Sequence, residues 1–550
     1  MCGIAGSFGM TCSGDSFESV FRALAHRGPD ASGVFRDQWL RLGMNRLAFR
    51  GANVDLPVRE IEAISAYNGQ VYGHIGANGS YVTVQEGLAN EIKTAASLLD
   101  ADGMYAYSRY SPRDCRLTLG TDRHFIKPLF VRQLQKEVVF ASEMAPLLRL
   151  GCPSTIHRDA LAELFAYGWY LSDQTCASDV SLVCKNDVTI GLSGIQRWPK
   201  RATLGTWSGV ADDKDIRSAI EGSVRRSTLG RGPLGLALSG GLDSSILAWE
   251  LNALGVENLV CVTVQTQDGG DDLASLAELG LPNPGSWRTW EHVVVRVEDE
   301  SFLRSFESSS LAFGQPTTMS SLPLYQQLAD AASAHGVRAM ILGEGVDEYF
   351  GGYGSYAKVA SLSRALDYYR YPARRRLVAT LFGEPALQAA EARFEDQYEG
   401  CRDLRTIEAQ LRLTRLLLRS DVCLMSRSIE GRVPFLHNDI PAMAMSIPWN
   451  EVTSGLGKAP LRRAYGADLG ERARRAKVRF KSSDAMLLRC LELDELESRI
   501  VAQCGRFFGR NRVVNALKEL RTVDGFDADI LCLMMSLTFL LENELLHGDS

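Results

Sequence analysis

The sequence predicts two domains in series: an α+β domain of stacked sheets, followed by an α/β domain built on a doubly wound parallel sheet with added helices. The length is the first observation, since 550 residues exceed what one ordinary hydrophobic core holds. Secondly, alternating apolar strands and tight turns prevail in the first third of the chain. Thirdly, an apolar run near residue 240 enters a glycine-rich loop and then a helical segment. We place the domains at 1–205 and 213–550, because Gly-Thr-Trp-Ser-Gly gives way there to a charged helical segment.

Composition and charge are those of an ordinary soluble enzyme. Hydrophobic residues make up 45% of the chain, charged residues make up 23%, and the net charge is −6, so no nucleic-acid or membrane partner is required. The 12 cysteines form no Cys-x-x-Cys pair and no signal peptide is evident, which indicates a cytoplasmic protein with reduced thiols. The apolar stretch 530–541 is too short to cross a bilayer and is expected to be a core helix. The sequence leaves open whether the chain forms a homodimer.

The stretch 234–251 predicts a phosphate site. An uncharged apolar run predicts a buried strand, which breaks into Ser-Gly-Gly and continues as a helix. Glycine N–H groups and a helix N-terminus attract an oxyanion, and an adjacent carboxylate suggests a metal ligand. Because no Lys-Ser or Lys-Thr pair closes the loop, it resembles instead the pyrophosphate loop of enzymes that split ATP into AMP and pyrophosphate to activate a carboxylate. The residues expected to contact the nucleotide here are Ser239, Gly240, Gly241, Leu242, Asp243, Ser244 and Ser245.

Cys2 is the candidate nucleophile of the first domain. After removal of Met1 it would carry a thiol and an α-amino group, whose ordinary pKa of ~7.7–8.0 suits a base for its own side chain. A cysteine after the initiator indicates little by itself, but a series of further segments follows. These are 26–30, 45–48, 67–72, 102–107, 122–130 and 140–144.

In this order, the segments resemble the N-terminal-nucleophile amidotransferase domain of the glutamine-dependent asparagine synthetases, and with the Ser-Gly-Gly loop the resemblance covers nearly the whole chain. It implies an αββα sandwich in which Cys2 attacks the side-chain amide of glutamine and releases ammonia. Arg46 would hold the glutamine α-carboxylate, while Asn68 and the Gly69 N–H would stabilise the oxyanion. Ala89 stands where the family has an aspartate for the glutamine α-amino group. Loss of that contact makes the free energy of glutamine binding less favourable by ~1.5–3 kcal/mol, which predicts weaker binding.

The second domain continues with the strands of a parallel sheet. The β-branched run 259–264 predicts its second strand, and the backbone of Val264 would flank the adenine by analogy with related nucleotide sites. The run 291–297 predicts another strand. Segment 315–323 stands where the family has an acceptor-side loop.

Segment 343–353 carries three carboxylates within five residues, at the end of a predicted strand. They would repel one another unless a cation or a substrate ammonium balanced them. The run resembles the second signature of the same family, which implies that Asp243 and Asp347 share magnesium and that Glu344 faces the acceptor or its adenylate. The resemblance adds two glycines to the nucleotide site, Gly343 and Gly345.

Two later segments, 428–436 and 457–462, match the family's Arg-Val-Pro-Phe-Leu and Lys-x-x-Leu-Arg motifs. Pro460 suits the first turn of a helix, which puts Lys458 at the helix start, where its side chain can reach the cleft. We expect Lys458 to neutralise charge on the α-phosphorus and the departing pyrophosphate.

Together these features predict a carbon–nitrogen ligase of the glutamine-hydrolysing asparagine synthase type, with ATP, Mg²⁺, glutamine and a carboxylate acceptor. Aspartate is the default acceptor, but Leu342 and the loop 315–323 are not typical, so a specialised metabolite stays open. One alternative is a ring-forming cyclase of the β-lactam synthetase or lasso-peptide cyclase type, which uses no glutamine; the Cys2 set argues against it. The other is a catalytically silent binding relative, against which the intact Ser-Gly-Gly loop argues. Ala89 leaves open whether glutamine or ammonia is the nitrogen donor, and the coupling between the sites is not fixed.

Overall fold

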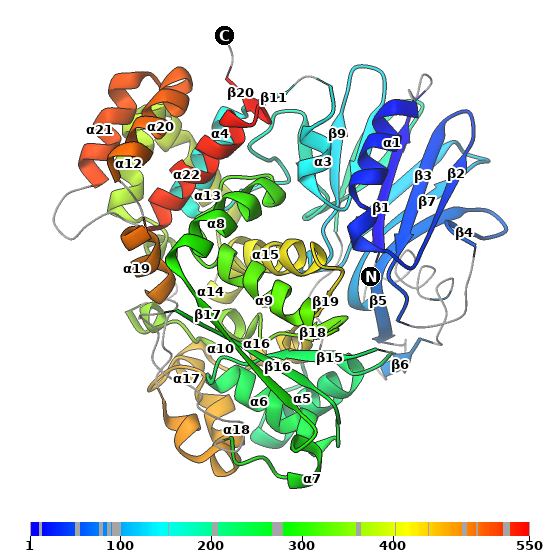
Figure 1. Cartoon of the computed structure of the whole chain (residues 1–550), viewed down its shortest axis with the longest axis vertical. Coiled ribbons are helices and arrows are strands. Elements are labelled where there is room, and N and C mark those ends of the chain that lie inside the picture. Colours follow the sequence, from blue (N-terminus) through cyan, green and yellow to red (C-terminus); the bar gives the residue numbers. More distant parts are fainter. Residues whose placement is uncertain are drawn as a thin grey trace.

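The computed structural model combines a pair of antiparallel sheets with a parallel sheet surrounded by helices (Figure 1). It describes residues 2–9, 14–49, 55–75, 81–84, 90, 101–151, 153–200, 207–230, 232–266, 279–358, 365–401, 403–437, 439–475, 481–490, 493–520 and 528–548.

Two antiparallel sheets make up the N-terminal part. The first has the strand order β12-β9-β10-β1-β3-β2. Its strands are β1 (Cys2–Phe8), β2 (Ala31–Arg36), β3 (Leu40–Arg46), β9 (Phe130–Gln133), β10 (Val138–Ala141) and β12 (Val180–Leu182). The second has the order β14-β13-β8-β7-β5-β4, with β6 also paired to β5. Its strands are β4 (Val58–Arg59), β5 (Ile64–Ile75), β6 (Tyr81–Thr83), β7 (Ala101–Ser111), β8 (Arg116–Thr121), β13 (Asn186–Gly191) and β14 (Gly194–Pro199).

Apolar side chains from both sheets form one buried cluster, as stacked sheets require. Ile4 and Met44 come from the first sheet, and Ala106 and Leu119 come from the second. Helices α1 (Gly14–Ala23) and α3 (Met144–Leu148) pack against the first sheet. Residues 85–100, between β6 and β7, lie outside the described residues except for Asn90.

The expected parallel sheet is confirmed. Its order is β17-β16-β15-β18-β19, and every neighbouring pair is parallel. The strands are β15 (Leu234–Ala237), β16 (Val260–Thr266), β17 (Glu291–Val297), β18 (Ala339–Ile341) and β19 (Glu430–Arg432). β15 pairs with both β16 and β18, so the direction of winding reverses there. In open α/β sheets such a reversal is where ligands bind, outside the carboxyl ends of the strands.

Helices cover both faces of this sheet. In Figure 1, α9 and α15 lie above the strands, whereas α5 and α6 lie below them. α8 and α18 pack against α9 and α5 respectively. The bounds are α5 (Asp213–Ser227), α6 (Leu242–Ala253), α8 (Asp299–Phe313), α9 (Leu322–Ala334), α15 (Thr414–Met425) and α18 (Ala459–Leu469). A π-helical turn, Ala409–Leu413, leads into α15.

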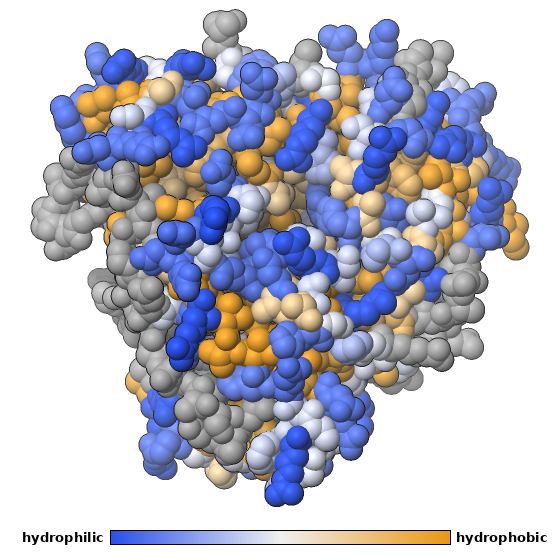
Figure 2. All heavy atoms as spheres, viewed as in Figure 1, coloured by the Kyte–Doolittle hydropathy of each residue, from blue (hydrophilic) through white to orange (hydrophobic). Residues whose placement is uncertain are grey.

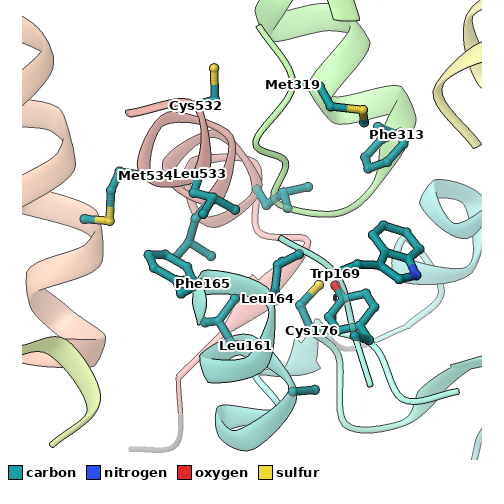
Figure 3. Close-up of a cluster of buried hydrophobic side chains, with 14 of the residues drawn as sticks. Leu161, Leu164, Phe165, Trp169, Cys176, Phe313, Met319, Cys532, Leu533 and Met534 are labelled. Atoms are coloured by element: carbon teal, nitrogen blue, oxygen red, sulfur yellow. Dashed lines mark hydrogen bonds between the residues drawn. The ribbon is translucent and has the colours of Figure 1, made fainter. Parts of the chain in front are cut away.

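A large apolar core joins the added helices to the rest of the chain. Figure 3 shows one part of it, in which Phe165 of α4 lies near Leu533 of α22 and Phe313, the last residue of α8, lies beside Met319. Residues 530–540 of α22 are buried, which confirms the predicted core helix. In the described part of the chain, no helix combines the length and hydropathy that a membrane span needs. The elements of this region are α4 (Arg158–Tyr167), α12 (Pro372–Phe382), α13 (Glu384–Tyr398), α20 (Leu493–Phe508), α21 (Arg510–Leu520) and α22 (Ala528–Glu542).

The chain end returns to the N-terminal part, where β20 pairs in parallel with β11. On the face shown in Figure 2, hydrophilic residues prevail over the outer helices, and a hydrophobic patch lies over the parallel sheet. The remaining elements are α7 (Pro284–Trp287), α10 (Val346–Phe350), α11 (Ala365–Tyr368), α14 (Leu404–Glu408), α16 (Asp439–Ser446), α17 (Trp449–Val452), α19 (Lys481–Cys490), β11 (Ser154–Thr155) and β20 (Leu546–His547).

Candidate functional site

The Ser-Gly-Gly loop joins β15 to α6 as expected. Gly240 has φ +71°, a left-handed conformation that glycine adopts without strain. Ser244 Oγ lies 3.2 Å from Ser239 Oγ and accepts a hydrogen bond from the Ser239 N–H at 3.2 Å, which folds the loop over the helix start. Among the described residues no side chain caps α6 at Gly241. The helix therefore presents an N-terminus suited to an anion.

Asp243, Asp347 and Lys458 meet at the reversal point of the sheet. Lys458 Nζ lies 2.6 Å from Asp243 Oδ2 and 2.7 Å from Asp347 Oδ1. Asp243 follows β15 and Asp347 follows β18, so the two carboxylates come from neighbouring strands. Burial opposes the charge on Lys458, but the two aspartates raise the pKa of its ammonium above the ordinary value. Lys458 is the residue before α18, as predicted, and stays protonated between two carboxylates.

Two backbone features hold this arrangement. Lys458 itself has φ 55°, a left-handed conformation that is strained for lysine and that persists where surrounding contacts fix it. Gly352 leaves no room for a side chain, since a Cβ there would lie 1.8 Å from Asp347 Oδ1 and 2.2 Å from Lys458 Cε. The glycine after the acidic run is thus needed for the close approach of lysine and aspartate.

Glu344 has different partners. Its Oε1 accepts hydrogen bonds from Tyr325 OH at 2.6 Å, Arg419 Nη2 at 2.7 Å and Ser420 Oγ at 3.0 Å. Arg419 also lies over the Tyr325 ring, 3.7 Å from its centroid. The third carboxylate, Glu348, accepts from Tyr353 OH at 2.6 Å. The three acidic side chains therefore point to separate partners, and Lys458 and Arg419 balance the charges of Asp347 and Glu344.

In the N-terminal part, Cys2 faces Arg46 across the β1–β3 pair, and its backbone N–H donates to Asn68 Oδ1 at 2.9 Å. Asn68 is buried, and its Nδ2 has no hydrogen-bond partner among the described residues. Gly69 has φ +125°, and a Cβ there would lie 1.9 Å from the Met104 carbonyl oxygen. The Cys2, Arg46, Asn68 and Gly69 set is thus brought together, with one buried amide donor left for a ligand.

The Cys2 thiol is buried, and burial raises its pKa above the ordinary value. The positive N-terminus, the Leu47 backbone N–H and Arg46 act in the opposite direction. A thiol with a raised pKa needs a base to become a nucleophile at neutral pH. Ala89, expected to weaken glutamine binding, lies outside the described residues.

Buried ion pairs connect the Cys2 region to the second domain. Arg27 donates to Glu143 Oε1 at 2.8 Å and to Asp421 Oδ2 at 2.7 Å, and Asp421 belongs to α15. Gln70 Nε2 donates to Glu430 Oε1 of β19 at 3.0 Å. Burial opposes ionisation of Glu430, but Arg432, the positive N-terminus and Lys127 lower its pKa to about 2.

Sequence patterns did not single out Tyr325, Arg419, Ser420 or Asp421. Three of them lie on α15, whose helical spacing is that of an ordinary buried helix, and no motif marks them. Val264 lies near the carboxyl end of β16, beside the strand that carries the Ser-Gly-Gly loop. Within the described residues, no group of three or more His, Cys, Asp or Glu side chains is placed to hold a metal.

A family profile described as asparagine synthase matches residues 215–529, more than half of the chain, and one described as a glutamine amidotransferase domain matches residues 1–193. Asparagine synthetase (glutamine-hydrolyzing) 1 of Bacillus subtilis is 25% identical over 392 residues, which cover 66% of this chain and 60% of the relative. Asparagine synthetase B (glutamine-hydrolyzing) of Escherichia coli is 26% identical over 387 residues, covering 64% and 65%. The chain therefore spans less than two thirds of the length of these two relatives. The glutamine-hydrolyzing asparagine synthetase of Zea mays is 24% identical over 505 residues, covering 85% and 74%.

Among solved structures, one described as the allosteric regulatory enzyme of purine biosynthesis aligns with a TM-score of 0.25 at 12% identity, covering 53% of this chain and 80% of that chain.

Proposed function

Because this chain belongs to the asparagine synthase family, we propose that it is an ATP-dependent amidotransferase. It takes ammonia from glutamine, joins a carboxylate to AMP with release of pyrophosphate, and converts the activated carboxylate to an amide. Aspartate is the default acceptor, and a specialised metabolite is the alternative. The observation that carries the proposal is the meeting of Asp243, Asp347 and Lys458 beside the Ser-Gly-Gly loop, at the reversal point of the sheet. A cytoplasmic location and a homodimer stay predictions.

The loop and its helix would hold the phosphates of ATP. The hydroxyl oxygens of Ser239 and Ser244 lie 3.2 Å apart at the start of α6, where the helix dipole favours negative charge. Gly343 keeps the next strand end close, since a Cβ there would lie 3.2 Å from Asp243 Cβ. The Val264 backbone would flank the adenine. Lys458 would neutralise charge as the acceptor carboxylate attacks the α-phosphorus and pyrophosphate departs.

Asp243 and Asp347 fit a magnesium ion. Both carboxylates lie within 2.7 Å of one cationic atom, Lys458 Nζ, which supports the proposal that they can share a small cation. Their donor atoms are oxygens, which Mg²⁺ prefers, and Mg²⁺ usually takes one or two carboxylates together with phosphate oxygens and water. When bound, the ion would neutralise charge on the phosphates of ATP.

In the first domain, Cys2 Sγ would attack the side-chain amide carbon of glutamine. The α-amino group exposed by removal of Met1 would take the thiol proton, which the buried thiol does not give up readily. Asn68 Nδ2 and the Gly69 N–H would stabilise the oxyanion, in agreement with the buried Asn68 Nδ2, which has no hydrogen-bond partner among the described residues. Arg46 would hold the glutamine α-carboxylate. Ammonia leaves, and water then hydrolyses the glutamyl thioester.

Ammonia must reach the adenylate without picking up a proton, since ammonium has no lone pair with which to attack. The contacts of α15 support a route through the protein. Its residue Asp421 accepts a hydrogen bond from Arg27 of the first domain, and the preceding residue, Ser420, donates one to Glu344. Glu344 would accept the proton that the nitrogen loses as it attacks the adenylate and AMP departs.

The test is pyrophosphate release with ATP, Mg²⁺ and a panel of carboxylates, with glutamine, with ammonium, or with neither. Release only with a nitrogen donor supports the proposal, and accumulation of ADP in place of AMP refutes it. Release without any nitrogen donor, with one amine-bearing substrate, would support ring closure instead.

Cys2→Ala should abolish glutamine-supported turnover and spare ammonium-supported turnover, because the thiol serves only the first reaction. The matched control is Cys115→Ala, a half-exposed cysteine of the same domain. A loss of both activities in the Cys2 variant would contradict the division of labour.

A further inference from the structure

Among the described residues, Arg415 has no carboxylate partner. It lies on α15 between Arg412 and Arg419, which pair with Glu408 at 2.6 Å and Glu344 at 2.7 Å. Arg415 Nη1 instead donates to two neutral oxygens, the Gly168 carbonyl at 3.1 Å and Thr318 Oγ1 at 2.7 Å. Within the described part of the chain, no Asp or Glu oxygen comes within 4.0 Å of its guanidinium nitrogens, and its Nε has no hydrogen-bond partner.

This position is electrostatically unfavourable for an arginine. Burial lowers the pKa of the Arg415 guanidinium, and Arg412 and Arg374 lower it further, while Asp529 and Glu408 act in the opposite direction. Arginine does not lose its proton in proteins, so the charge remains. The Arg415 side chain is half-buried, and the positive potential that it shares with the neighbouring Arg412 and Arg374 attracts an anion.

The segment that faces Arg415 has its own unmet hydrogen-bonding groups. Thr318 belongs to the loop between α8 and α9, and so does Gln315. Gln315 is fully buried, yet neither its Oε1 nor its Nε2 has a hydrogen-bond partner among the described residues. In native proteins the large majority of buried side-chain polar atoms are paired, so an amide without a partner in the described residues, on the loop that Arg415 contacts through Thr318, points to a ligand.

The same loop and helix lead directly to the proposed acceptor site. Arg419 donates to Ser321 Oγ at 2.7 Å and to Glu344 at 2.7 Å, one helical turn from the contact between Arg415 and Thr318. Residues four apart on a helix lie roughly 6 Å from each other. Arg419 and Arg415 thus contact the loop from successive turns of α15. The Arg419 contact lies at Glu344, and the Arg415 contact lies one helical turn further from Glu344.

We infer that Arg415 and Thr318 form an oxyanion subsite for the acceptor. The acceptor then carries a second anionic group, a carboxylate or a phosphate, at least ~6 Å from the carboxylate that is activated beside Glu344. This inference rests on the proposed function for the identity of the ligand as acceptor. It favours an acceptor longer than aspartate, which agrees with the untypical loop 315–323.

The test is equilibrium binding to the full chain in the absence of ATP, with hexanoate, adipate, succinate and 6-phosphonohexanoate as probes. The variant is Arg415→Gln, and Arg427→Gln is the control, an exposed arginine just after the same helix. We expect adipate or the phosphonate to bind wild type and control alike and to bind the Arg415 variant about 10- to 100-fold more weakly, as for loss of a charge-assisted hydrogen bond. Hexanoate should not distinguish the three proteins, and succinate should bind more weakly than adipate.

Whichever of adipate and phosphonate shows the larger loss identifies the anion. Equal affinity of both probes for wild type and the Arg415 variant, or no binding of either to wild type, overturns the inference. Because the binding experiment contains no ATP, its result does not depend on pyrophosphate release, and a failure of that release refutes only the proposed function. Conversely, if Arg415→Gln and wild type turn over the acceptor with the same KM, only the subsite is refuted.

Thermal unfolding separates a ligand site from a structural role. Arg415→Gln removes two hydrogen bonds to neutral oxygens but leaves no carboxylate of the described residues without its cation, so the variant without ligand should melt only slightly earlier than wild type. Arg412→Gln leaves Glu408 buried without its cation and should melt earlier. If the Arg415 variant melted as early as the Arg412 variant, Arg415 would be a structural residue and the subsite would be refuted.

Discussion

Replacing Lys458 with methionine leaves Asp243 and Asp347 facing each other without a cation. Each carboxylate has an oxygen within 2.7 Å of Lys458 Nζ, so the two oxygens are no more than about 5.4 Å apart. At an effective dielectric constant of ~20, two unit charges at ~5 Å repel by ~3 kcal/mol. The side chains of Lys458, Asp347 and Asp243 are 4%, 14% and 19% exposed, so solvent screens the repulsion only in part. We expect Lys458→Met to lower the free energy of unfolding by ~3 kcal/mol at pH 7 without Mg²⁺.

Urea unfolding followed by tryptophan fluorescence measures this loss between pH 5 and 8. In wild type, the raised pKa of Lys458 contributes stability that is present below its unfolded pKa and is lost only as alkaline pH rises through the folded value, so the contribution is constant in this window. In the variant, repulsion raises the pKa of one aspartate above its unfolded value. Stability should therefore recover as pH falls toward 5, and Mg²⁺ should restore it at pH 7.

The control is Lys518→Met, which removes an exposed lysine of α21. It should change the free energy of unfolding by less than ~0.5 kcal/mol, as surface substitutions usually do. The electrostatic reasoning fails if Lys458→Met is as stable as this control at pH 7, or if its loss depends neither on pH nor on Mg²⁺.

Three further predictions concern other parts of the two sites. Glu430→Gln should flatten the acid limb of the stability curve measured by acid unfolding with circular dichroism. In wild type the pKa of Glu430 is lowered from the ordinary value of 4.5 to about 2, so the ionised carboxylate contributes ~3 kcal/mol of stability above pH 4.5, and this contribution is lost as pH falls toward 2. A variant with the wild-type acid limb would contradict this. Asn68→Ala should lower glutaminase kcat by ~10²–10³ and leave ammonium-supported turnover intact, in a coupled glutamate assay; an equal fall in both would count against an oxyanion role. Gly352→Ala should abolish pyrophosphate release, since its Cβ would overlap Asp347 Oδ1, whereas Gly354→Ala, with no atom within 4 Å, should not; equal activity of the two would refute the steric argument.

Local pattern was enough to predict the parts of the fold that local chemistry determines. The apolar run before the Ser-Gly-Gly loop became β15, and the helix after it begins at Leu242 as expected. Pro460 lies in the first turn of α18 and Lys458 directly precedes it. In each case a few neighbouring residues carry the whole signal, namely an uncharged run, a glycine pair or a proline at a helix start.

The partners of Glu344 could not be predicted in this way. Tyr325 and Arg419 lie 19 and 75 residues from it in the sequence, and neither sits in a motif. Strand β19 was likewise not foreseen, because 430–432 is a short segment with two charged residues that pairs with β18 only once the sheet exists. The charge of Arg432 is balanced there by Glu430 at 2.6 Å. Such pairings depend on topology, which periodicity does not encode.

Helix α15 connects the features that were missed. Asp421 is buried against Arg27 of the first domain, Ser420 and Arg419 hold Glu344, and Arg415 contacts the loop at Thr318. Consecutive residues on a helix point about 100° apart, so positions 420 and 421 can face different domains from one rigid element. Breaking a buried ion pair such as Arg27–Asp421 costs ~3–5 kcal/mol, which keeps the helix from sliding along the first domain. A single helix therefore fixes the distance between the Cys2 region and Glu344, and the two domains need no flexible linkage to keep these regions in register.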